Sequence, residues 1–261
     1  MATPAVKPIP EGYRAITPYI TVREARELVD FLQQVFGANL LFQGTGGAGG
    51  MHFELKLGDS RLMVGGGQSY PGPRYPTSIH LKVDDVDQIY ARAVQFGALS
   101  LYEPRDFDYG ERGAGVKDMA SSHWYLATPK GKTHFLPEMG TITPYLHPRG
   151  AADLIHFLKS AFGAVEVTRE DAPDGTVQHA KVRIGDSILE LSEAHGEYQP
   201  MPSMFYVYVN NVDNSYARAL EAGGKSIEAL ADQSYGDRRA AIADPLGHRW
   251  YLATHIKDVH V

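Results

Sequence analysis

Few residues of this chain could carry catalytic chemistry, and Glu190 is the most distinctive of them. It lies in the apolar run Ile188-Leu189-Glu190-Leu191, which is typical of a strand. If its side chain faces the interior, desolvation would raise the pKa of the carboxyl group and suit it to proton transfer. If the side chain faces outward, it is an ordinary solvated residue, and both interpretations stay open.

Three histidines could add metal-binding chemistry to this glutamate. Imidazole and carboxylate groups are the ligands that Zn²⁺, Ni²⁺, Fe²⁺ and Mn²⁺ accept in proteins. The candidate metal ligands of these types are His80, His147, His179 and Glu190. The chain has no cysteine, which excludes thiolate ligands and disulfides. No local ligand pair such as HExxH is present, and a histidine on a strand is usually packed in the core. We therefore expect no cofactor, with a divalent metal at these four residues as the alternative.

A carboxylate next to an arginine occurs twice, in Tyr109-Gly110-Glu111-Arg112 and in Tyr235-Gly236-Asp237-Arg238. One interpretation is a ligand clamp, in which Arg238 or Arg112 binds an anionic group through its planar guanidinium. The other is a loop that a local salt bridge holds in place, and we favour this structural interpretation.

The composition is that of an ordinary globular protein. The 261 residues, 43% of them hydrophobic, suffice for two domains of about 100–150 residues each. A net charge of −6 argues against a general nucleic-acid binder. No apolar run approaches the roughly 20 residues that span a membrane, and the proline-rich N-terminus lacks the apolar core of a secretory signal. We therefore expect a cytoplasmic protein that binds neither nucleic acid nor membrane.

The chain is a tandem duplication. Many short segments recur about 126 residues further on. Examples are Thr17-Pro18-Tyr19 with Thr143-Pro144-Tyr145, and Trp124-Tyr125-Leu126-Ala127-Thr128 with Trp250-Tyr251-Leu252-Ala253-Thr254. The predicted organisation is an extended arm (1–12), a first domain (13–128), a linker (129–138), a second domain (139–254) and a tail (255–261).

Each repeat contains the order strand, helix and three strands twice. Leu28, Val29 and Leu32 recur at helical spacing before Gly37, and Asp85 can cap a second helix. In the first repeat we predict strands at 15–22, 40–43, 52–57, 61–64, 78–83, 99–103, 114–117 and 123–127, and helices at 24–36 and 86–96. The whole chain thus carries four βαβββ units.

Four βαβββ units, with Tyr-Gly-Asp-Arg and then Asp244-Pro245-Leu246-Gly247-His248-Arg249-Trp250 closing the second repeat, resemble the vicinal oxygen chelate superfamily. The chain is most similar to the glyoxalase/bleomycin-resistance/dioxygenase proteins, in the branch related to the 3-demethylubiquinone methyltransferase-like proteins. The resemblance covers nearly the whole chain and is weaker at Asp118-Met119-Ala120-Ser121-Ser122-His123 of the first repeat. It implies an α+β fold of two tandem domains, in which pairs of βαβββ units curl into curved-sheet cups.

Metalloenzymes of this superfamily place ligands on the first and last strands of each unit. On this chain the corresponding positions are Thr17, Met63, Ser78, Tyr125, Thr143, Glu190, Met204 and Tyr251. Hydroxyls and thioethers suit a transition metal poorly, and Glu190 is the one carboxylate among them. The inferred cup walls are instead aromatic, which suits a flat organic ligand. The predicted ligand-binding residues are Tyr19, His80, Tyr125, Tyr145, Tyr206, Arg238 and Tyr251, with Glu190 as the catalytic candidate.

Two functions follow from the resemblance. The preferred one is the metal-independent binding of a small hydrophobic or aromatic compound. The alternative is a divalent-metal-dependent lyase, isomerase or dioxygenase, so whether the chain is an enzyme stays open. The duplication implies either a monomer that mimics a dimer of single domains or a homodimer. Whether each cup forms within one repeat or between the two repeats also stays open.

Overall fold

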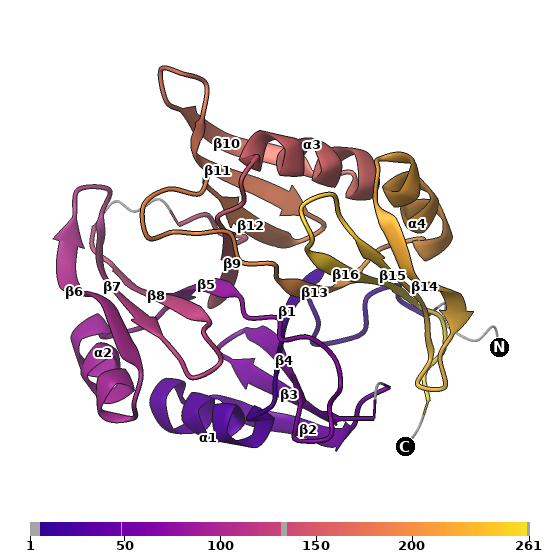
Figure 1. The fold of residues 1–261 in the computed structure, drawn as a ribbon, viewed down its shortest axis with the longest axis horizontal. Helices are drawn as coiled ribbons and strands as arrows, with labels where there is room; N and C mark the ends of the chain where they lie inside the picture. Colours follow the sequence, from indigo (N-terminus) through magenta and orange to yellow (C-terminus); the bar gives the residue numbers. More distant parts are fainter. Residues whose placement is uncertain (1–5, 48, 132–134, 260–261) are drawn as a thin grey trace. The chain divides into compact units, whose positions relative to one another are not determined.

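The computed structural model describes residues 6–47, 49–131 and 135–259, and its elements follow the duplicated order (Figure 1). Parts of the predicted arm (1–5), linker (132–134) and tail (260–261) lie outside the described residues. The first repeat contains β1 (Ile16–Val22), α1 (Ala25–Phe36), β2 (Asn39–Thr45), β3 (Met51–Leu57), β4 (Ser60–Gly66), β5 (Ser78–Lys82), α2 (Val86–Gln95), β6 (Leu99–Phe107), β7 (Glu111–Lys117) and β8 (His123–Pro129).

The second repeat has the same order of elements. It contains β9 (Ile142–Leu146), α3 (Ala151–Phe162), β10 (Val165–Asp171), β11 (Val177–Ile184), β12 (Ser187–Leu191), β13 (Met204–Tyr208), α4 (Val212–Glu221), β14 (Lys225–Asp232), β15 (Asp237–Ala243) and β16 (Arg249–His255). The predicted four βαβββ units are therefore confirmed. No helix in the part of the chain that the structure describes is long and apolar enough to cross a membrane.

Strands β6, β7 and β15 are longer than the sequence pattern predicted. β6 continues to Phe107 and β7 begins at Glu111, so the turn between them is three residues long. β15 likewise begins at Asp237, which we had placed in a turn. The apolar pattern missed these ends because most of the extra residues are polar, proline or glycine. As a result, Glu111 and Asp237 are strand residues with fixed side-chain directions.

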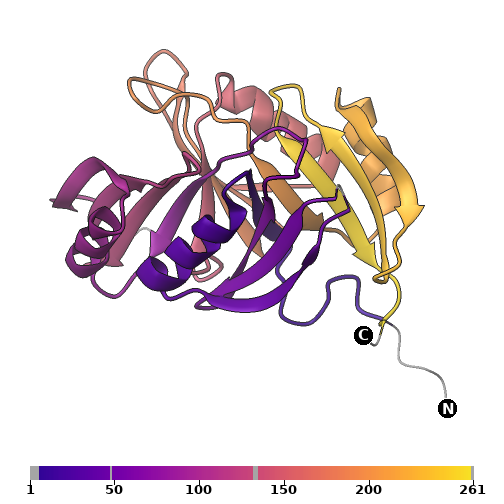
Figure 2. The same ribbon diagram turned by 60° about the horizontal axis from the view of Figure 1, so that its bottom comes forward.

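Local sequence explains the helix ends. Asp85 accepts a hydrogen bond from the backbone N–H of Gln88 and caps α2, as predicted, and Asn211 caps α4 in the same way. α1 ends at Gly37, which adopts the left-handed conformation that glycine favours. The buried face of α1 packs on β3 and β4, and Figure 2 shows this indigo helix beside the strands of its own repeat.

The strands form two sheets of eight. Their orders are β14-β15-β16-β13-β1-β4-β3-β2 and β10-β11-β12-β9-β5-β8-β7-β6. The pattern inside each βαβββ unit repeats: the last three strands are antiparallel and the final strand runs parallel to the first. β5 with β8 and β13 with β16 are such parallel pairs.

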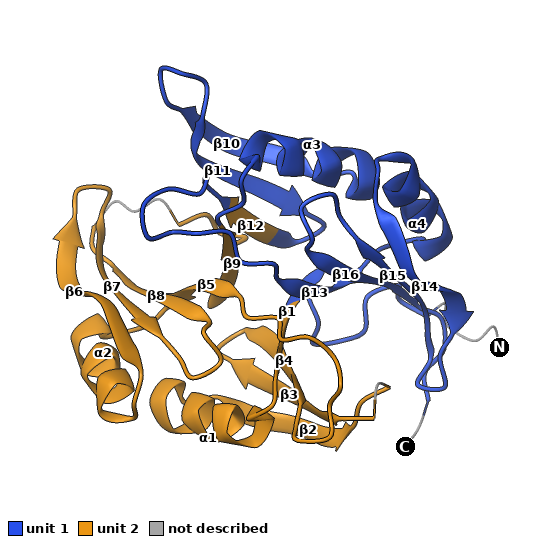
Figure 3. Ribbon diagram, in the orientation of Figure 1, with its two compact units in different colours: residues 1–17, 147–187, 191–261 blue, residues 18–146, 188–190 orange. Residues whose placement is uncertain are grey.

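The chain divides into two compact units (Figure 3). Unit 1 comprises residues 1–17, 147–187 and 191–261, and unit 2 comprises residues 18–146 and 188–190. The domain bounds predicted from the repeat stay a prediction. Unit 2 contains strands of both repeats, because β5 pairs antiparallel with β9, with His80 opposite Thr143. The sheet that contains β5 is therefore built between the repeats, which the sequence had left open.

The hairpin before the last strand of each repeat is held by one buried aspartate. Asp244 accepts hydrogen bonds from the backbone N–H groups of Leu246 and His248 and from the indole of Trp250. Asp118 makes the equivalent three bonds in the first repeat. The first-repeat hairpin therefore keeps its geometry without the Pro and Gly, and Ser121 takes the positive φ that Gly247 has in the second repeat.

Candidate functional site

His80 lies at the centre of a buried polar cluster in unit 2. Its Nδ1 donates a hydrogen bond of 2.8 Å to Oε2 of Glu190 on β12. Its Nε2 lies 3.5 Å from Oε2 of Glu111 on β7. All three residues are buried, and Glu190 is only 1% exposed. We call these three residues the His80 cluster. The structure thus joins two predicted site residues that are 110 positions apart in the sequence.

The cluster keeps the imidazole protonated. Burial by itself lowers the pKa of His80, since it disfavours a charged ring. The charges of Glu190 and Glu111 and their hydrogen bonds to the ring act the other way and prevail, so the pKa rises from 6.5 to about 9. At neutral pH His80 is therefore an imidazolium ion between two carboxylates.

The strand register shows which residues share a face with His80. His80 is directly opposite Tyr125 on β8 and Thr143 on β9. The ligand-position scheme had named Ser78, which lies two residues earlier on the same strand face and is opposite His123. The ring of Tyr125 meets the ring of Tyr145 edge to face at a centroid distance of 5.7 Å, and the ring of Phe135 lies 5.1 Å from that of His80. Aromatic side chains thus lie beside His80.

The donor set does not fit a catalytic metal as it is arranged. Both ring nitrogens of His80 face carboxylate oxygens, and the protonated ring has no nitrogen lone pair to offer a cation. The strand neighbours of His80, Tyr125 and Thr143, supply only hydroxyls. Among residues 6–47, 49–131 and 135–259, no group of three His, Asp or Glu side chains is arranged to hold a metal ion.

The other two histidines of the alternative metal site lie in unit 1. His147 makes a 2.7 Å hydrogen bond with the hydroxyl of Ser192, and its ring packs against Tyr198. His179 is on β11. The structure therefore pairs His80 with Glu190 and gives His147 a different partner.

In unit 1, the residues that correspond through the repeat to His80 and Glu111 form a different hydrogen-bond network. Asp237, the counterpart of Glu111, accepts hydrogen bonds from the hydroxyls of Tyr206 and Tyr208 and contacts Nδ1 of His255 at 2.9 Å. Tyr206 occupies the position of His80 and stacks on Tyr251 at a centroid distance of 6.4 Å. The two predicted ligand-binding tyrosines of unit 1 therefore lie together, and a tyrosine takes the place of His80.

Arg238 is already paired with two carboxylates. It bonds Asp213 on α4 and Asp232 on β14, and Arg112 bonds Asp87 and Asp106 in the same way. These contacts favour the structural interpretation of the repeated motif, and the ligand clamp stays a prediction. The acidic residue of the motif, in contrast, enters the buried networks. The sequence did show an acidic residue repeated at Glu111 and Asp237. We had, however, given the functional role in this motif to the arginine that follows.

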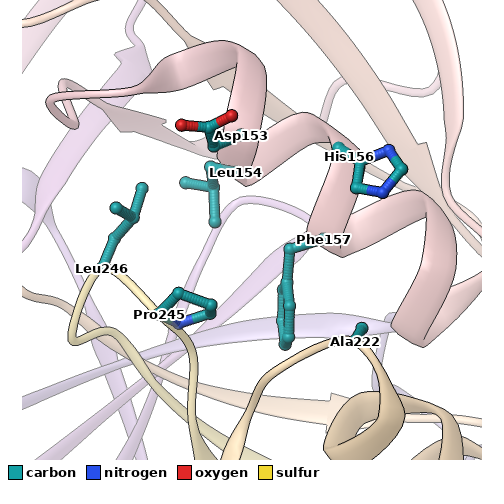
Figure 4. A pocket seen from close by; sticks show the side chains of 7 residues that line it. All are labelled: Asp153, Leu154, His156, Phe157, Ala222, Pro245 and Leu246. Carbon is teal, nitrogen blue, oxygen red and sulfur yellow. The ribbon is translucent and has the colours of Figure 1, made fainter.

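A small hollow of about 180 Å³ lies elsewhere in unit 1, between α3, the end of α4 and the β15–β16 turn (Figure 4). It is lined by Asp153, Leu154, His156, Phe157, Ala222, Pro245 and Leu246. None of the predicted site residues lines it.

Comparison with known proteins agrees with this architecture. Residues 15–124 and 149–252 match the family model of the Glyoxalase/Bleomycin resistance protein/Dioxygenase superfamily. An uncharacterized protein of Mycobacterium tuberculosis (strain H37Rv) is 33% identical over 143 residues, which cover 51% of this chain and 84% of that protein. An uncharacterized protein of Mycobacterium bovis is 34% identical over 131 residues, 46% of this chain and 86% of that protein. Glyoxalase I of Zea mays has the same fold, with a TM-score of 0.68, 17% identity, and coverage of 91% of this chain and 92% of that chain.

Proposed function

Because the chain belongs to the Glyoxalase/Bleomycin resistance protein/Dioxygenase superfamily, we propose that it binds a small aromatic or hydrophobic compound at the His80 cluster, without a catalytic metal. One observation carries the proposal: both nitrogens of the His80 ring are engaged by carboxylates. A protonated ring cannot ligate a metal, whereas its charged cluster can still fix the polar end of an organic molecule.

The chemistry of the cluster suits a ligand that carries a hydrogen-bond donor. A carboxylate has about four lone-pair positions, so a group that binds the imidazolium can accept a further bond from a ligand hydroxyl or N–H. The rings of Tyr125 and Tyr145 supply flat apolar contact beside it. Glu190, the predicted catalytic residue, would in this function hold His80 in its protonated form.

Metal analysis tests the metal-independent part of the proposal. We expect protein purified without chelator to contain divalent metal well below one ion per chain. Zn²⁺, Ni²⁺, Mn²⁺ and Fe²⁺ added in calorimetric titrations should bind no more tightly to the wild type than to Glu190→Ala. A stoichiometric metal ion that Glu190→Ala removes would overturn the proposal.

That result would instead support the alternative, a metal-dependent lyase, isomerase or dioxygenase. The specific observation in its favour is that His80 and Glu190, an imidazole and a carboxylate, meet within unit 2. The alternative requires that His80 lose its proton and release a carboxylate before it could ligate an ion.

A neutral phenol tests the binding part. We expect 2-naphthol, which joins a flat ring system to one hydroxyl donor, to bind with an affinity that falls about tenfold in Glu190→Gln and in Tyr125→Ala. Isothermal titration calorimetry measures the affinity. The matched control is Tyr216→Phe, which removes a tyrosine hydroxyl that bonds Ser226 on the surface of unit 1. Equal affinity of all four proteins would contradict the proposed site.

A further inference from the structure

A second group of interacting polar side chains, separate from the His80 cluster, lies on β1 and β3 of unit 2. The hydroxyl of Tyr19 bonds Nδ1 of His52 at 2.9 Å. On the other side of the ring, Nε2 of His52 lies 3.7 Å from Oε1 of Glu54. Arg61 bonds the other oxygen of Glu54 at 2.9 Å and holds that carboxylate in place. We call Tyr19, His52 and Glu54 the Tyr19 relay.

The strand alternation explains why the relay is accessible. On β3, Phe53 and Leu55 are fully buried in the core, whereas His52 and Glu54 point to the opposite face. The side chains of His52 and Glu54 are 18% and 16% exposed. The relay is thus partly exposed, and more so than the His80 cluster.

Gly65 makes the contact between Tyr19 and His52 possible. It is opposite His52 in the β3–β4 register. A Cβ atom at Gly65 would lie 2.8 Å from both the ring and the hydroxyl oxygen of Tyr19, closer than real Cβ atoms approach. The ring and hydroxyl of Tyr19 therefore pass close to the glycine, and the hydroxyl reaches the histidine. This close approach indicates that Tyr19 can take this position only when residue 65 is glycine.

The duplication shows that the relay is specific to the first repeat. The counterparts of Tyr19 and His52 are Tyr145 and His179, but the counterpart of Glu54 is Lys181, and that of Gly65 is Ser192. A lysine cannot orient or stabilise an imidazolium as a carboxylate does. The two repeats therefore diverged at the residues that make the relay.

A hydroxyl, a histidine and a carboxylate in this order are the groups of a site in which the histidine acts as a base and activates the hydroxyl. The tautomer of His52 that satisfies both contacts carries its proton on Nε2, toward Glu54, and offers the lone pair of Nδ1 to the hydroxyl of Tyr19. When Tyr19 gives up its proton to Nδ1, the charge of Glu54 stabilises the imidazolium that forms. A carboxylate thus lies on the far side of the base, where its charge favours the imidazolium, as in other general-base sites.

We propose that the Tyr19 relay is a metal-independent general-base site that removes a proton from a planar carbon acid. Tyr19 Oη accepts the substrate proton as its own proton passes to Nδ1 of His52, and the electron pair of the broken C–H bond enters the substrate. The ring of Phe42, half-exposed and 6.1 Å from that of His52, supplies an apolar wall that suits a planar substrate. This activity does not rest on ligand binding at the His80 cluster.

The probe 5-nitrobenzisoxazole tests the proposal without a known substrate. A base removes the proton on C3, the electron pair of that C–H bond completes a nitrile, and the N–O bond breaks to leave a phenolate, whose absorbance reports the rate. The proton that His52 takes up returns to water. We expect the wild type to accelerate this elimination above an equal concentration of free imidazole.

Three variants identify the group responsible. Tyr19→Phe and His52→Gln should each lower the rate about a hundredfold, the ordinary contribution of a positioned general base. Gly65→Ala should lower it by at least tenfold although no relay group is removed, because the added methyl group displaces Tyr19. The matched control is Tyr90→Phe, which deletes an exposed tyrosine hydroxyl that bonds Ser100 in the same unit and should leave the rate unchanged.

Circular dichroism and the unfolding midpoint show whether each variant is folded, and Tyr19→Phe removes a single oxygen atom. The proposal is overturned if the wild type does not exceed free imidazole, or if folded Tyr19→Phe retains the rate of Tyr90→Phe. Loss of 2-naphthol binding in Glu190→Gln with an intact elimination rate would separate this site from the His80 cluster.

Discussion

His80 carries a proton at neutral pH although it is buried, and the reason is the pair of carboxylates beside it. Its pKa is about 9 in the folded chain and 6.5 as an ordinary value. The protonated ring therefore stabilises the fold fully below about pH 6.5, and this contribution is lost as pH rises through about 9. The difference corresponds to roughly 3 kcal/mol of unfolding free energy.

This behaviour gives a prediction for one residue. In Glu190→Gln the pKa of His80 should fall, because the nearer negative charge is removed. The alkaline loss of stability between pH 6.5 and 9 should then shrink. Proton NMR of the ring gives the pKa, and urea unfolding across this range gives the stability. Glu197→Gln, at an exposed glutamate, is the control. An ordinary pKa of His80 in the wild type would contradict the prediction.

At the scale of an element, the hairpins before β8 and β16 differ at one backbone conformation. Ser121 has a φ of 68°, and its counterpart Gly247 has a φ of 90°. A side chain in this left-handed region costs about 1 kcal/mol, whereas glycine adopts it freely. Exchanging serine and glycine between these two equivalent positions therefore tests the cost of this backbone conformation.

We expect Ser121→Gly to raise the free energy of unfolding by about 0.5–1 kcal/mol, and Gly247→Ser to lower it by about 1 kcal/mol. A Cβ at Gly247 would meet no atom within 4 Å, so the cost is that of the backbone alone. Chemical denaturation measures both changes. Ser69→Gly, at an exposed residue with an ordinary φ, should be neutral or slightly destabilising. Changes of the same sign in both hairpins would refute this account.

The aspartate of the same hairpin supports a second prediction for the element. Asp244→Ala removes the acceptor of two backbone N–H groups and of the Trp250 indole, all close to the core. Because unsatisfied buried donors cost about 1–3 kcal/mol each in unfavourable cases, we expect a loss of roughly 3 kcal/mol in unfolding free energy. The exposed Asp108→Ala is the control. A loss no larger than that of the control would show that the hairpin does not depend on this side chain.

At the scale of the whole molecule, the repeats share strands rather than merely following one another. β5 of the first repeat pairs with β9 of the second, and His80 bonds Glu190 within the same unit. A cut between the repeats should therefore not release two separate proteins. The sheet hydrogen bonds and the buried ion pair would still join the halves.

We expect a chain cleaved at a protease site introduced at the exposed Glu138 to elute from a size-exclusion column as one species. The same column in urea, above the unfolding midpoint, should resolve the two fragments and so confirms the cleavage. If the halves separate in native buffer, the strands shared by unit 2 do not hold the repeats together.

Much of the fold could be predicted from the sequence, and less of the site. The helical spacing around Leu28 and the cap at Asp85 are local signals, so the elements followed from them. Strand alternation correctly predicted that Ser78 and His80 lie on the same strand face, but it could not predict which residues of other strands they contact. The ends of β7 and β15 were missed because Glu111 and Asp237 are polar, and with them the acids of both buried networks.

The sequence by itself determined the duplication, the order of the βαβββ units and the family, because repeats, periodicity and turn residues are all readable along the chain. Only the tertiary structure decided that β5 pairs with β9, that Glu190 meets His80, and that Tyr19 reaches His52 over Gly65. Alternation fixes the face on which a side chain lies, but strand pairing and register fix its neighbour. Those depend on how distant segments pack together.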